Sequence, residues 1–472
     1  MISFNLDFVV KATAAQVLSR HQEIFEGIAT DTRVGMSRRL FIALKGDAFD
    51  AHQFLESAAQ QGAAAILLHD DSKLTPQLLE RVTVIKVKDT LRALQDLATA
   101  YRRKSSAEII GIAGSNGKTT SKEFCAALLG TFRKVHYSKG SFNNHWGVPF
   151  TLLAMSEESE LAVVEMGMNH AGELALLAQI AEPDITVVTY VGIEHIEHFG
   201  TLEKIAQAEE EIYQHSPAKA VRIFNLDNIY TREMLPRSKA HFPQARVLTF
   251  SEKESADVQL RIKSVSMQEL MVTGQIGSVS GEATVPVFGK HNITNLMVAA
   301  AVGLAAGLTP QQIWSGLSAC RTTWGRNQLL TTESGALILF DAYNSNPDSM
   351  MALVENMSLV HAEGRKLGIF AEMRELGELA PQLHQETGQS VGKSNLDLIW
   401  FYGDHAEDFA RGLRESKFAG EILTNKDFDL ATAKKLAGSL RKGDIALVKG
   451  SRGMQLERFV KEAKPLFFEA KT

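Results

Sequence analysis

A glycine-rich segment between two apolar stretches constrains the fold of this chain more than any other feature. Residues 111–120 read GIAGSNGKTT; isoleucines precede them, and apolar residues repeat at helical spacing after them, from Phe124 to Leu128. This order predicts a strand, a glycine loop and a helix. Such a loop aims backbone N–H groups and the positive end of the helix dipole at one point, where an anion binds best. The segment therefore predicts a phosphate-binding loop.

The glycine spacing departs from the usual phosphate-loop template. That template has a glycine five positions before Gly117, but Ile112 stands there, and the glycines fall at 111, 114 and 117. We expect Lys118 to reach the outer phosphates and the Thr119 hydroxyl to hold Mg²⁺. The alternative is a glycine turn with a solvated lysine. A phosphate site alone does not define the reaction.

Apolar, β-rich runs alternate with helical patterns along the chain, which predicts an α/β fold of parallel sheets covered on both faces. At 472 residues the chain suits about three domains. We expect a small α/β module at 1–104, a central phosphate-loop sheet with extra β segments at 105–321, and a Rossmann-like doubly wound sheet at 322–472. The strand candidates are 40–44, 64–68, 84–87, 109–113, 161–164, 185–191, 221–224, 337–340, 367–370, 398–402 and 445–448.

Composition narrows the functional classes. A net charge of −5 without runs of like charge does not indicate nucleic-acid binding. The longest apolar run, 297–308, is shorter than the ~20 residues of a membrane span, and the first residues lack a basic segment followed by an apolar core. Two distant cysteines fit reduced thiols. We expect a cytoplasmic protein without membrane insertion, and a monomer.

Polar residues follow two β-rich runs of the central section. Glu165 follows one run, and Glu194 with His195 follows another. Ligands of parallel sheets bind beyond the carboxyl ends of the strands, so we expect these groups to complete a magnesium site with Thr119. Two alternatives are a glutamate that caps a helix or forms an ion pair, and a zinc site that starts at His195 and His198. No third zinc ligand stands at a suitable spacing.

Motifs along the whole chain resemble those of the Mur ligase family, ATP-dependent enzymes that build the peptide of the bacterial cell wall. The glycine spacing 111, 114, 117 matches the family's GxxGxxGKT form. The other matches are FNNHWGVPFTLL at 142–153, VVEMGMNHAGEL at 163–174, GKHNITNLMVAA at 289–300, GR at 325–326, DAYNSNPDSM at 341–350 and KGSRGM at 449–454. They are most similar to the member that adds D-alanyl-D-alanine to UDP-N-acetylmuramoyl-tripeptide, and the DNPR-type pattern of the preceding ligase is absent.

The resemblance implies a reaction. The terminal carboxylate of the tripeptide attacks the γ-phosphate of ATP, and the amine of D-alanyl-D-alanine then attacks the acyl phosphate and expels phosphate. Both steps concentrate negative charge that Mg²⁺ and basic groups offset. Three alternatives stay open: another Mur-type ligase that adds a single amino acid, a P-loop kinase or hydrolase, and a non-catalytic nucleotide-binding scaffold.

The resemblance also implies roles for individual residues. The phosphate-binding set is Gly114, Ser115, Asn116, Gly117, Lys118, Thr119 and Thr120. The remaining nucleotide contacts are Asn292 and Asn295 at adenine, Arg326 at the γ-phosphate, Asp341 at the ribose and Tyr343 beside it. The UDP-binding set is Thr32, Arg33, Lys45 and Gly46. The metal ligands are Thr119, Glu165, His195 and Glu209, and the catalytic set is Lys118, Glu165, His195, Glu209 and Arg326.

Some of these roles have an alternative or depend on local geometry and domain closure. Asn292 could instead cap a helix. The family usually has DGH where this chain has Asp50-Ala51-His52, so the geometry of that turn is open. ATP is expected between the second and third sections, so domain closure must bring Arg326 and Asp341 onto it.

Glu209 stands where the family has a lysine. The family pattern IAxAKxEI carries a lysine that is carbamylated and faces the second Mg²⁺, whereas this chain reads IAQAEEEIY. We hypothesise that Glu209 supplies that negative charge directly. The alternative is a solvated acidic helix face, because three glutamates follow one another at 209–211.

Overall fold

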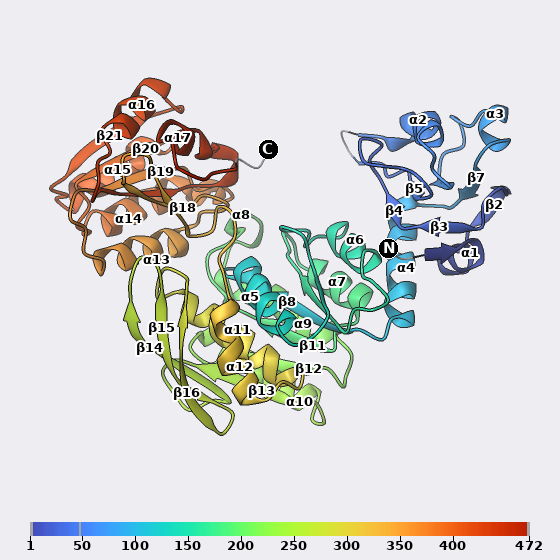
Figure 1. The fold of residues 1–472 in the computed structure, drawn as a ribbon, viewed down its shortest axis with the longest axis horizontal. Helices are drawn as coiled ribbons and strands as arrows, with labels where there is room; N and C mark the ends of the chain where they lie inside the picture. The colour runs from blue at the N-terminus through green and yellow to red at the C-terminus, as the bar shows by residue number, and fades with distance from the viewer. Residues whose placement is uncertain (1–2, 47–48, 470–472) are drawn as a thin grey trace.

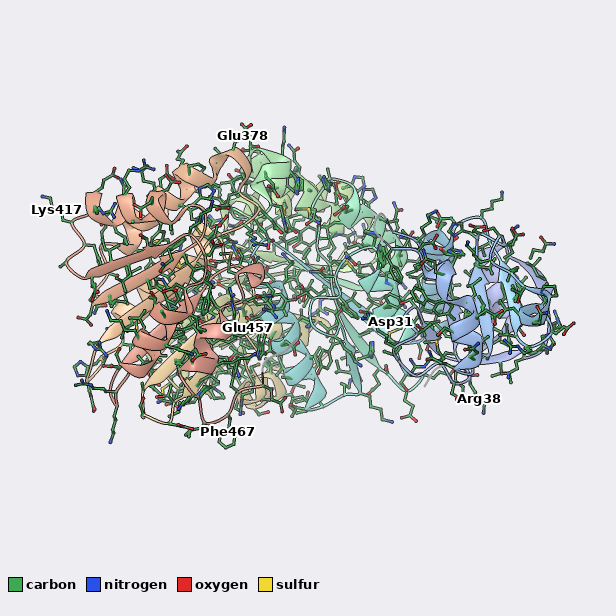
Figure 2. The ribbon with its side chains drawn as sticks, turned by 90° about the horizontal axis from the view of Figure 1, so that it is seen from above. Asp31, Arg38, Glu378, Lys417, Glu457 and Phe467 are labelled. Carbon is green, nitrogen blue, oxygen red and sulfur yellow. The ribbon has the colours of Figure 1, made fainter. Side chains whose placement is uncertain are left out.

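Three α/β units lie in a row in the computed structural model, which describes residues 3–46 and 49–469. Figures 1 and 2 show the N-terminal unit at one end, the central unit next to it and the C-terminal unit at the other end. The α/β class and the parallel sheets expected from the sequence are confirmed. Within the described residues, no helix has the length and apolar character needed to cross a membrane.

The N-terminal unit holds a five-stranded sheet in the order β2-β7-β6-β5-β4, and a separate antiparallel pair, β1 with β3. Its strands are β1 (Ser3–Asn5), β2 (Gln16–Ser19), β3 (Ile24–Glu26), β4 (Ile28–Ala29), β5 (Leu40–Ile42), β6 (Ala65–Leu68) and β7 (Thr83–Lys86). Its helices are α1 (Leu6–Thr13), the 3-10 helix η1 (Ala51–Phe54), α2 (Leu55–Gln60), α3 (Pro76–Leu79) and α4 (Thr90–Lys104).

The central unit holds a nine-stranded sheet in the order β16-β15-β14-β13-β12-β11-β8-β10-β9, parallel from β9 to β14 and antiparallel beyond. Its strands are β8 (Glu108–Ala113), β9 (Val135–Tyr137), β10 (Leu161–Glu165), β11 (Ile185–Val188), β12 (Val221–Asn225), β13 (Val247–Ser251), β14 (Val258–Val265), β15 (Leu270–Ile276) and β16 (Val279–Val285). Its helices are α5 (Lys118–Gly130), α6 (Gly147–Leu153), α7 (Glu173–Ala181), α8 (Ile196–Phe199), α9 (Leu202–His215), α10 (Ile229–His241), α11 (Asn292–Ala305), α12 (Pro310–Gly316) and the 3-10 helix η2 (Leu317–Ala319).

The C-terminal unit holds a six-stranded sheet in the order β17-β18-β22-β19-β20-β21, in which only the β17–β18 pair is antiparallel among the described pairs. Its strands are β17 (Gln328–Thr331), β18 (Leu337–Asp341), β19 (Lys366–Ala371), β20 (Leu398–Tyr402), β21 (Glu421–Asn425) and β22 (Ile445–Lys449). Its helices are α13 (Pro347–Ser358), α14 (Ala380–Val391), α15 (Ala406–Glu415), α16 (Leu430–Gly438), α17 (Glu457–Glu462) and the 3-10 helices η3 (Gly377–Leu379) and η4 (Arg452–Met454).

Helix α4 joins the first unit to the second. Asp89 caps its first turn by accepting a hydrogen bond from the Arg92 N–H, and three basic residues in its last turn complement the helix dipole. The helix packs against α1 on one side and against α6 and α7 on the other. Near its end, Arg102 forms an ion pair of 2.6 Å with Asp184 of the central unit. The connection is therefore a packed helix that fixes the two units to each other.

Strand register brings the expected site residues together. Strands β10 and β11 flank β8, with Glu165 opposite Ile112 and Val188 opposite Ala113. The segments that follow these strands therefore leave the sheet at one edge. In the C-terminal unit, Asp341 stands opposite Lys449 at the corresponding edge of β18 and β22.

Candidate active site

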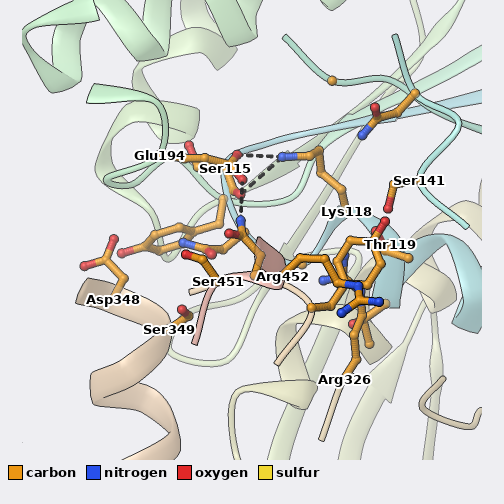
Figure 3. Close-up of a pocket in the computed structure, with 18 of the residues that line it drawn as sticks. Ser115, Lys118, Thr119, Ser141, Glu194, Arg326, Asp348, Ser349, Ser451 and Arg452 are labelled. Carbon is orange, nitrogen blue, oxygen red and sulfur yellow. Dashed lines mark hydrogen bonds and ion pairs between the residues drawn. The ribbon is translucent and has the colours of Figure 1, made fainter. Parts of the chain in front are cut away.

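A cavity of about 710 Å³ lies between the central and C-terminal units, and Figure 3 shows part of its lining. Segments after β8, β10 and β11, the start of α11, and residues after β18 and β22 contribute to it. Twelve of the residues expected from the sequence line this cavity: Ser115, Asn116, Gly117, Lys118, Thr119, Thr120, Glu165, His195, Asn295, Arg326, Asp341 and Tyr343. Gly114, Asn292, Glu209 and the UDP-binding set are not among the described lining residues.

The glycine loop adopts a backbone that depends on its glycines. Gly114 and Gly117 have φ angles of +125° and +85°, a region that side chains disfavour. A Cβ at Gly114 would collide with the Thr189 hydroxyl, which instead donates a hydrogen bond of 2.6 Å to the Asn116 carbonyl. Helix α5 then begins at Lys118 directly after the loop. The loop thus presents the N-terminus of a 13-residue helix to the cavity.

Lys118 points into the cavity, where its ammonium lies 2.6 Å from Glu194 and donates to the Ser115 carbonyl at 3.2 Å (Figure 3). Burial alone lowers the pKa of Lys118, but Glu194 and Glu209 outweigh that effect and raise it. The side chain therefore carries a positive charge at a site that is poor in water. A phosphate oxygen could therefore replace Glu194 and bind the Lys118 ammonium, which is already charged.

Glu165 has the properties of a metal-binding carboxylate. It is 1% exposed, and its Oε1 accepts hydrogen bonds from Thr119 Oγ1 at 3.1 Å and from Asn143 Nδ2 at 2.9 Å. Its Oε2 has no hydrogen-bond partner among the described residues. Lys122, which is fully buried, lies 4.0 Å from this oxygen and donates to the Ser138 carbonyl. Hard oxygen donors with one unused carboxylate oxygen fit Mg²⁺.

His195 connects the two units that form the cavity. It has a φ of +52°, and its Nδ1 lies 2.6 Å from Glu375 of the C-terminal unit, an ion-pair distance without good hydrogen-bond geometry. Burial opposes the charged ring, but Glu375 and Glu194 outweigh burial and raise the pKa of His195. The structure therefore shows His195 in a contact across the cavity, and its role as a metal ligand stays a prediction.

The acidic run at 209–211 is not a solvated helix face. Glu209 and Glu210 are 2% and 5% exposed. Glu210 pairs with Arg237 at 2.8 Å, and Glu211 accepts hydrogen bonds from N–H groups at the start of α7. Burial raises the pKa of Glu209 to about 8, with Lys118 opposing the shift, and its Oε2 has no hydrogen-bond partner among the described residues. The carboxyl group lies behind the loop, close enough to influence Lys118.

The two asparagines at the start of α11 play different structural roles. Asn295 lines the cavity, and its Oδ1 accepts a hydrogen bond from Ser121. Asn292 is 1% exposed; its Nδ2 donates to the Phe288 carbonyl, and its Oδ1 accepts from Asn295. Asn292 therefore supports Asn295 in this structure, and its expected contact with adenine stays a prediction. Its capping alternative is wrong, because residue 291 occupies the cap position without a side-chain bond.

The C-terminal unit contributes basic groups to the cavity. The Arg326 guanidinium lies over the Tyr343 ring, 4.5 Å from its centre. Lys449 is almost fully buried and forms an ion pair of 2.6 Å with Asp341. The Asn327 N–H also donates to Asp341, at 3.1 Å. Asp341 is thus held in place while it faces the cavity.

The start of helix α13 explains part of the DAYNSNPDSM motif. Asn346 caps the helix by accepting from the Ser349 N–H, and its amide donates to Asn116 of the glycine loop at 3.0 Å. Asp348 accepts from the Ile193 N–H at 3.1 Å. The two units already meet here, with Arg326 and the loop on the same cavity. Arg326 and Asp341 thus face the same cavity as the loop, and domain closure onto a bound nucleotide stays a prediction.

The expected UDP-binding set lies on the N-terminal unit, outside the cavity. Arg33 is largely exposed and forms an ion pair of 2.7 Å with Asp31, and Lys45 lies 3.8 Å from Asp50. Thr32, between Asp31 and Arg33 in the sequence, is half-buried. Gly46 approaches Trp146, 3.6 Å from where a Cβ would stand.

The turn in which this chain has Asp50-Ala51-His52 is well formed. Asp50 caps η1, and its Oδ1 lies 2.6 Å from His52 Nδ1. Ala51 is 1% exposed, so the place where the family has glycine is filled here by a buried methyl group.

Several cavity residues had no motif that assigned them a role. Asn143 belongs to the matched segment at 142–153, and Lys449 to that at 449–454, but only the fold shows what they contact. His291 lies 3.0 Å from both Asn327 and Asn356, and burial lowers its pKa to about 4. His291 lies inside the matched segment at 289–300, so a polar residue within a matched motif is the signal that could have indicated it.

Comparison with known proteins gives consistent results along the whole chain. Three family models match: "Mur ligase family, catalytic domain" over residues 25–102, "Mur ligase middle domain" over 112–303, and "Mur ligase, glutamate ligase domain" over 325–452. A Bacillus subtilis protein named UDP-N-acetylmuramoyl-tripeptide--D-alanyl-D-alanine ligase is 38% identical over 460 residues, which cover 97% of each chain.

Two solved structures resemble this one closely. MurF from Acinetobacter baumannii superposes with a TM-score of 0.87 at 25% identity, covering 98% of this chain and 99% of the other. MurF from Thermotoga maritima, solved in complex with ADP, has a TM-score of 0.79 at 26% identity, covering 93% of this chain and 97% of the other.

Proposed function

This chain belongs to the Mur ligase family, and on that premise we propose that it joins D-alanyl-D-alanine to UDP-N-acetylmuramoyl-tripeptide with hydrolysis of ATP to ADP and phosphate. One observation carries the proposal: the loop cation Lys118, the buried carboxylate Glu165 and the opposing guanidinium Arg326 line a single cavity. That set suits phosphoryl transfer to a carboxylate.

The nucleotide-binding role rests on residues of both units. Residues 114–120 would hold the phosphates through backbone N–H groups and Lys118, with the dipole of α5 behind them. Arg326 would bind the γ-phosphate, which explains why its guanidinium, although stacked on Tyr343, has no carboxylate partner among the described residues. We assign Asp341 to the ribose and Asn295 to adenine. His291, beside Asn295, joins this proposed nucleotide wall.

The reaction needs an activated carboxylate because an amine and a carboxylate form only a salt at neutral pH. An oxygen of the tripeptide carboxylate attacks the γ-phosphorus, and ADP leaves. The amine of the dipeptide then attacks the carbonyl carbon of the acyl phosphate and loses a proton. Phosphate leaves and takes with it the carboxylate oxygen that attacked the γ-phosphorus. Lys118 and Arg326 offset the charge that develops on the transferred group.

The donor set after β8 and β10 fits Mg²⁺. Thr119 Oγ1 and Glu165 would hold the ion, and Asn143 orients Glu165 through its hydrogen bond of 2.9 Å. When bound, Mg²⁺ supplies positive charge to the phosphate oxygens. His195 is proposed as a further ligand, which it would become by exchanging Glu375 for the metal.

Glu209 is proposed to supply the negative charge that a carbamylated lysine provides elsewhere in the family. Its support is burial next to Lys118 with one oxygen that has no hydrogen-bond partner among the described residues. Because burial raises the pKa of Glu209 to about 8, a bound cation would have to favour the charged form at neutral pH. Glu209→Ala should lose most activity, and Glu209→Lys should regain part of it when bicarbonate is added. Unchanged turnover of the alanine variant would show that this carboxylate has no such role.

We propose that residues 1–104 bind the UDP-sugar through Thr32, Arg33, Lys45 and Gly46, and that 105–321 and 322–472 enclose ATP. Trp146, which Gly46 approaches, ends a loop whose Ser141 and Asn143 line the cavity. The tripeptide would follow this loop from the N-terminal unit to Glu165. A monomer in the cytoplasm suits soluble substrates of this kind.

The proposal is tested by phosphate release and mass spectrometry of the product. The purified chain should release phosphate only when ATP, the UDP-muramoyl-tripeptide and the dipeptide are all present, and one amide product should form per phosphate. Lys118→Ala should abolish both signals. Phosphate release without the dipeptide would favour a hydrolase, and faster turnover with a single amino acid would favour another ligase of the family.

A further inference from the structure

The basic residues that line the cavity are not equally engaged. The five lysines and arginines among the described lining residues are Lys118, Arg326, Arg374, Lys449 and Arg452. Three of them have carboxylate partners, namely Lys118 with Glu194 at 2.6 Å, Lys449 with Asp341 at 2.6 Å and Arg452 with Glu457 at 2.7 Å. Arg326 is assigned to the nucleotide. Arg374 has no carboxylate partner within the described part of the chain, and no step of the reaction described so far uses it.

The guanidinium of Arg374 lies against the turn at 451–454. Its Nη2 donates to Met454 Sδ at 3.6 Å, and a Cβ at residue 453 would collide with its Nη1. Glycine at position 453 therefore makes room for this guanidinium. Hydrogen bonds to a thioether are weak, so most of the donor capacity of the guanidinium is left for a ligand.

The backbone that carries Arg374 is held on both sides. The Arg374 N–H donates to Ser451 Oγ at 2.9 Å, and the Met373 N–H donates to His384 Nε2 at 3.0 Å. The next residue, Glu375, reaches across the cavity to His195. Arg374 thus stands at a defined place on the C-terminal wall, adjacent to the residue that contacts the central unit.

We propose that Arg374 and the turn at 451–454 form the subsite for the free carboxylate of the incoming dipeptide. This assignment rests on the proposed function, because it takes that dipeptide as the substrate. The amine of the dipeptide must reach a carbonyl activated near Lys118 and Glu165, and two extended residues span roughly 7 Å. Its carboxylate lies at the other end of the substrate, and we place it at Arg374, which lines the C-terminal wall of the same cavity. A guanidinium fork binds both oxygens of a carboxylate.

The subsite gives a physical reason for choosing a dipeptide. A single amino acid has its carboxylate next to its amine and cannot place one group at the acyl carbon and the other at Arg374. A longer peptide would drive its carboxylate past the turn. Arg374 therefore selects substrates by the distance between their nucleophilic amine and their carboxylate.

Steady-state kinetics of Arg374→Ala test this assignment. The KM for D-alanyl-D-alanine should rise about 10- to 100-fold, as expected for the loss of a charge-assisted pair, while the KM values for ATP and the tripeptide stay unchanged. Arg374→Lys should give an intermediate KM. Arg414→Ala is the matched control, because Arg414 lies on α15, outside the cavity lining, and pairs with Glu407; it should leave every constant unchanged.

A substrate without the carboxylate separates binding from a structural role. With the unmodified protein, D-alanyl-D-alaninamide should have a higher KM than D-alanyl-D-alanine. Replacing Arg374 with alanine should leave the KM of the amide unchanged. The assignment would be overturned if Arg374→Ala raised the KM of the amide as much as it raised that of D-alanyl-D-alanine. A rise in the KM for ATP or tripeptide, in place of the KM for the dipeptide, would overturn it too. Failure of the unmodified protein to form any amide product would reject the proposed function, whereas full efficiency of Arg374→Ala would reject only this subsite.

Discussion

Two glycines of the phosphate loop have conformations that other residues adopt only with strain. Gly114→Ala should destabilise the protein by about 1–3 kcal/mol, because it combines a φ of +125° with a collision against Thr189. ATP-dependent turnover should be lost together with this stability. Thermal unfolding and phosphate release measure the two effects.

Gly130→Ala is the matched control for that substitution. Gly130 is the last residue of α5, its φ is not in the left-handed region, and a Cβ there would meet nothing within 4 Å. Alanine should therefore leave activity intact and keep or slightly raise stability. If both variants behaved alike, the loop conformation described here would be wrong.

At the residue scale, the sequence predicted the groups whose motifs have a chemical meaning. The strand-loop-helix order places Lys118 and Thr119, and the end of a neighbouring strand places Glu165. It could not show that Asn292 supports Asn295, or that Glu209 is buried, because both depend on contacts between segments far apart in the chain. A run of three glutamates indicates solvent exposure unless the fold is known.

Among the elements, helix α14 carries a histidine that must stay neutral. His384 Nε2 accepts the Met373 N–H, so the ring proton is on Nδ1, which donates to the Ala380 carbonyl at 2.7 Å. Burial lowers the pKa of His384 to about 4. The unfolded chain takes up a proton below about pH 6.5, whereas the folded chain does not until about pH 4. The contribution of His384 to stability is therefore present above pH 6.5 and is lost as the pH falls toward 4.

His384→Asn should flatten this dependence. Urea unfolding at several pH values between 7 and 4.5 should show a smaller loss of stability in the variant than in the unmodified protein. His215→Asn, on the surface of α9, should keep the full pH dependence. Parallel pH profiles for His384→Asn and the unmodified protein would contradict a neutral, buried ring.

The joint between α4 and the central sheet offers a second test among the elements. Arg102 is 12% exposed and bonds Asp184 and the Ala181 carbonyl, whereas the neighbouring Arg103 is 65% exposed and pairs with Glu182. Arg102→Ala should cost about 2 kcal/mol or more, and Arg103→Ala less than about 1 kcal/mol. Equal effects in denaturant unfolding would show that this joint does not depend on the buried pair.

The elements that the sequence predicted are the buried ones. Continuous apolar runs mark β8, β10, β19 and β22, since parallel strands covered on both faces need them. Edge strands such as β21, which reads EILTN and is half-exposed, carry no such run and were not predicted. Their pairing comes from the neighbouring strand and leaves a weak signal in the sequence.

For the whole molecule, contacts between the central and C-terminal units decide how the cavity is enclosed. Asp348 is half-buried and accepts a hydrogen bond from the Ile193 N–H, and its partial burial raises the pKa of this carboxyl group. Asp348→Ala should loosen the units, which small-angle X-ray scattering would show as a larger radius of gyration and kinetics as a higher KM for ATP. Asp404→Ala, at an exposed ion pair with Lys426, should change neither. An unchanged radius of gyration in Asp348→Ala would mean that other contacts hold the units together.

The order of the three units could be read from the sequence, but their placement could not. Motifs indicate which segments bind the nucleotide, and they do not indicate whether the units stand apart or together. The bond between Asn346 and Asn116 joins residues 230 positions apart, and no local pattern predicts such a contact.

Formation of an acyl phosphate in the cavity is tested by following the oxygen of the activated carboxylate. The UDP-muramoyl-tripeptide is labelled with ¹⁸O in its terminal carboxylate and converted with ATP and D-alanyl-D-alanine. Because phosphate leaves with one carboxylate oxygen, we expect one ¹⁸O in each phosphate released and one retained in the amide. Unlabelled phosphate would mean that ATP does not phosphorylate this carboxylate, and would contradict the assignment of the cavity to acyl-phosphate chemistry.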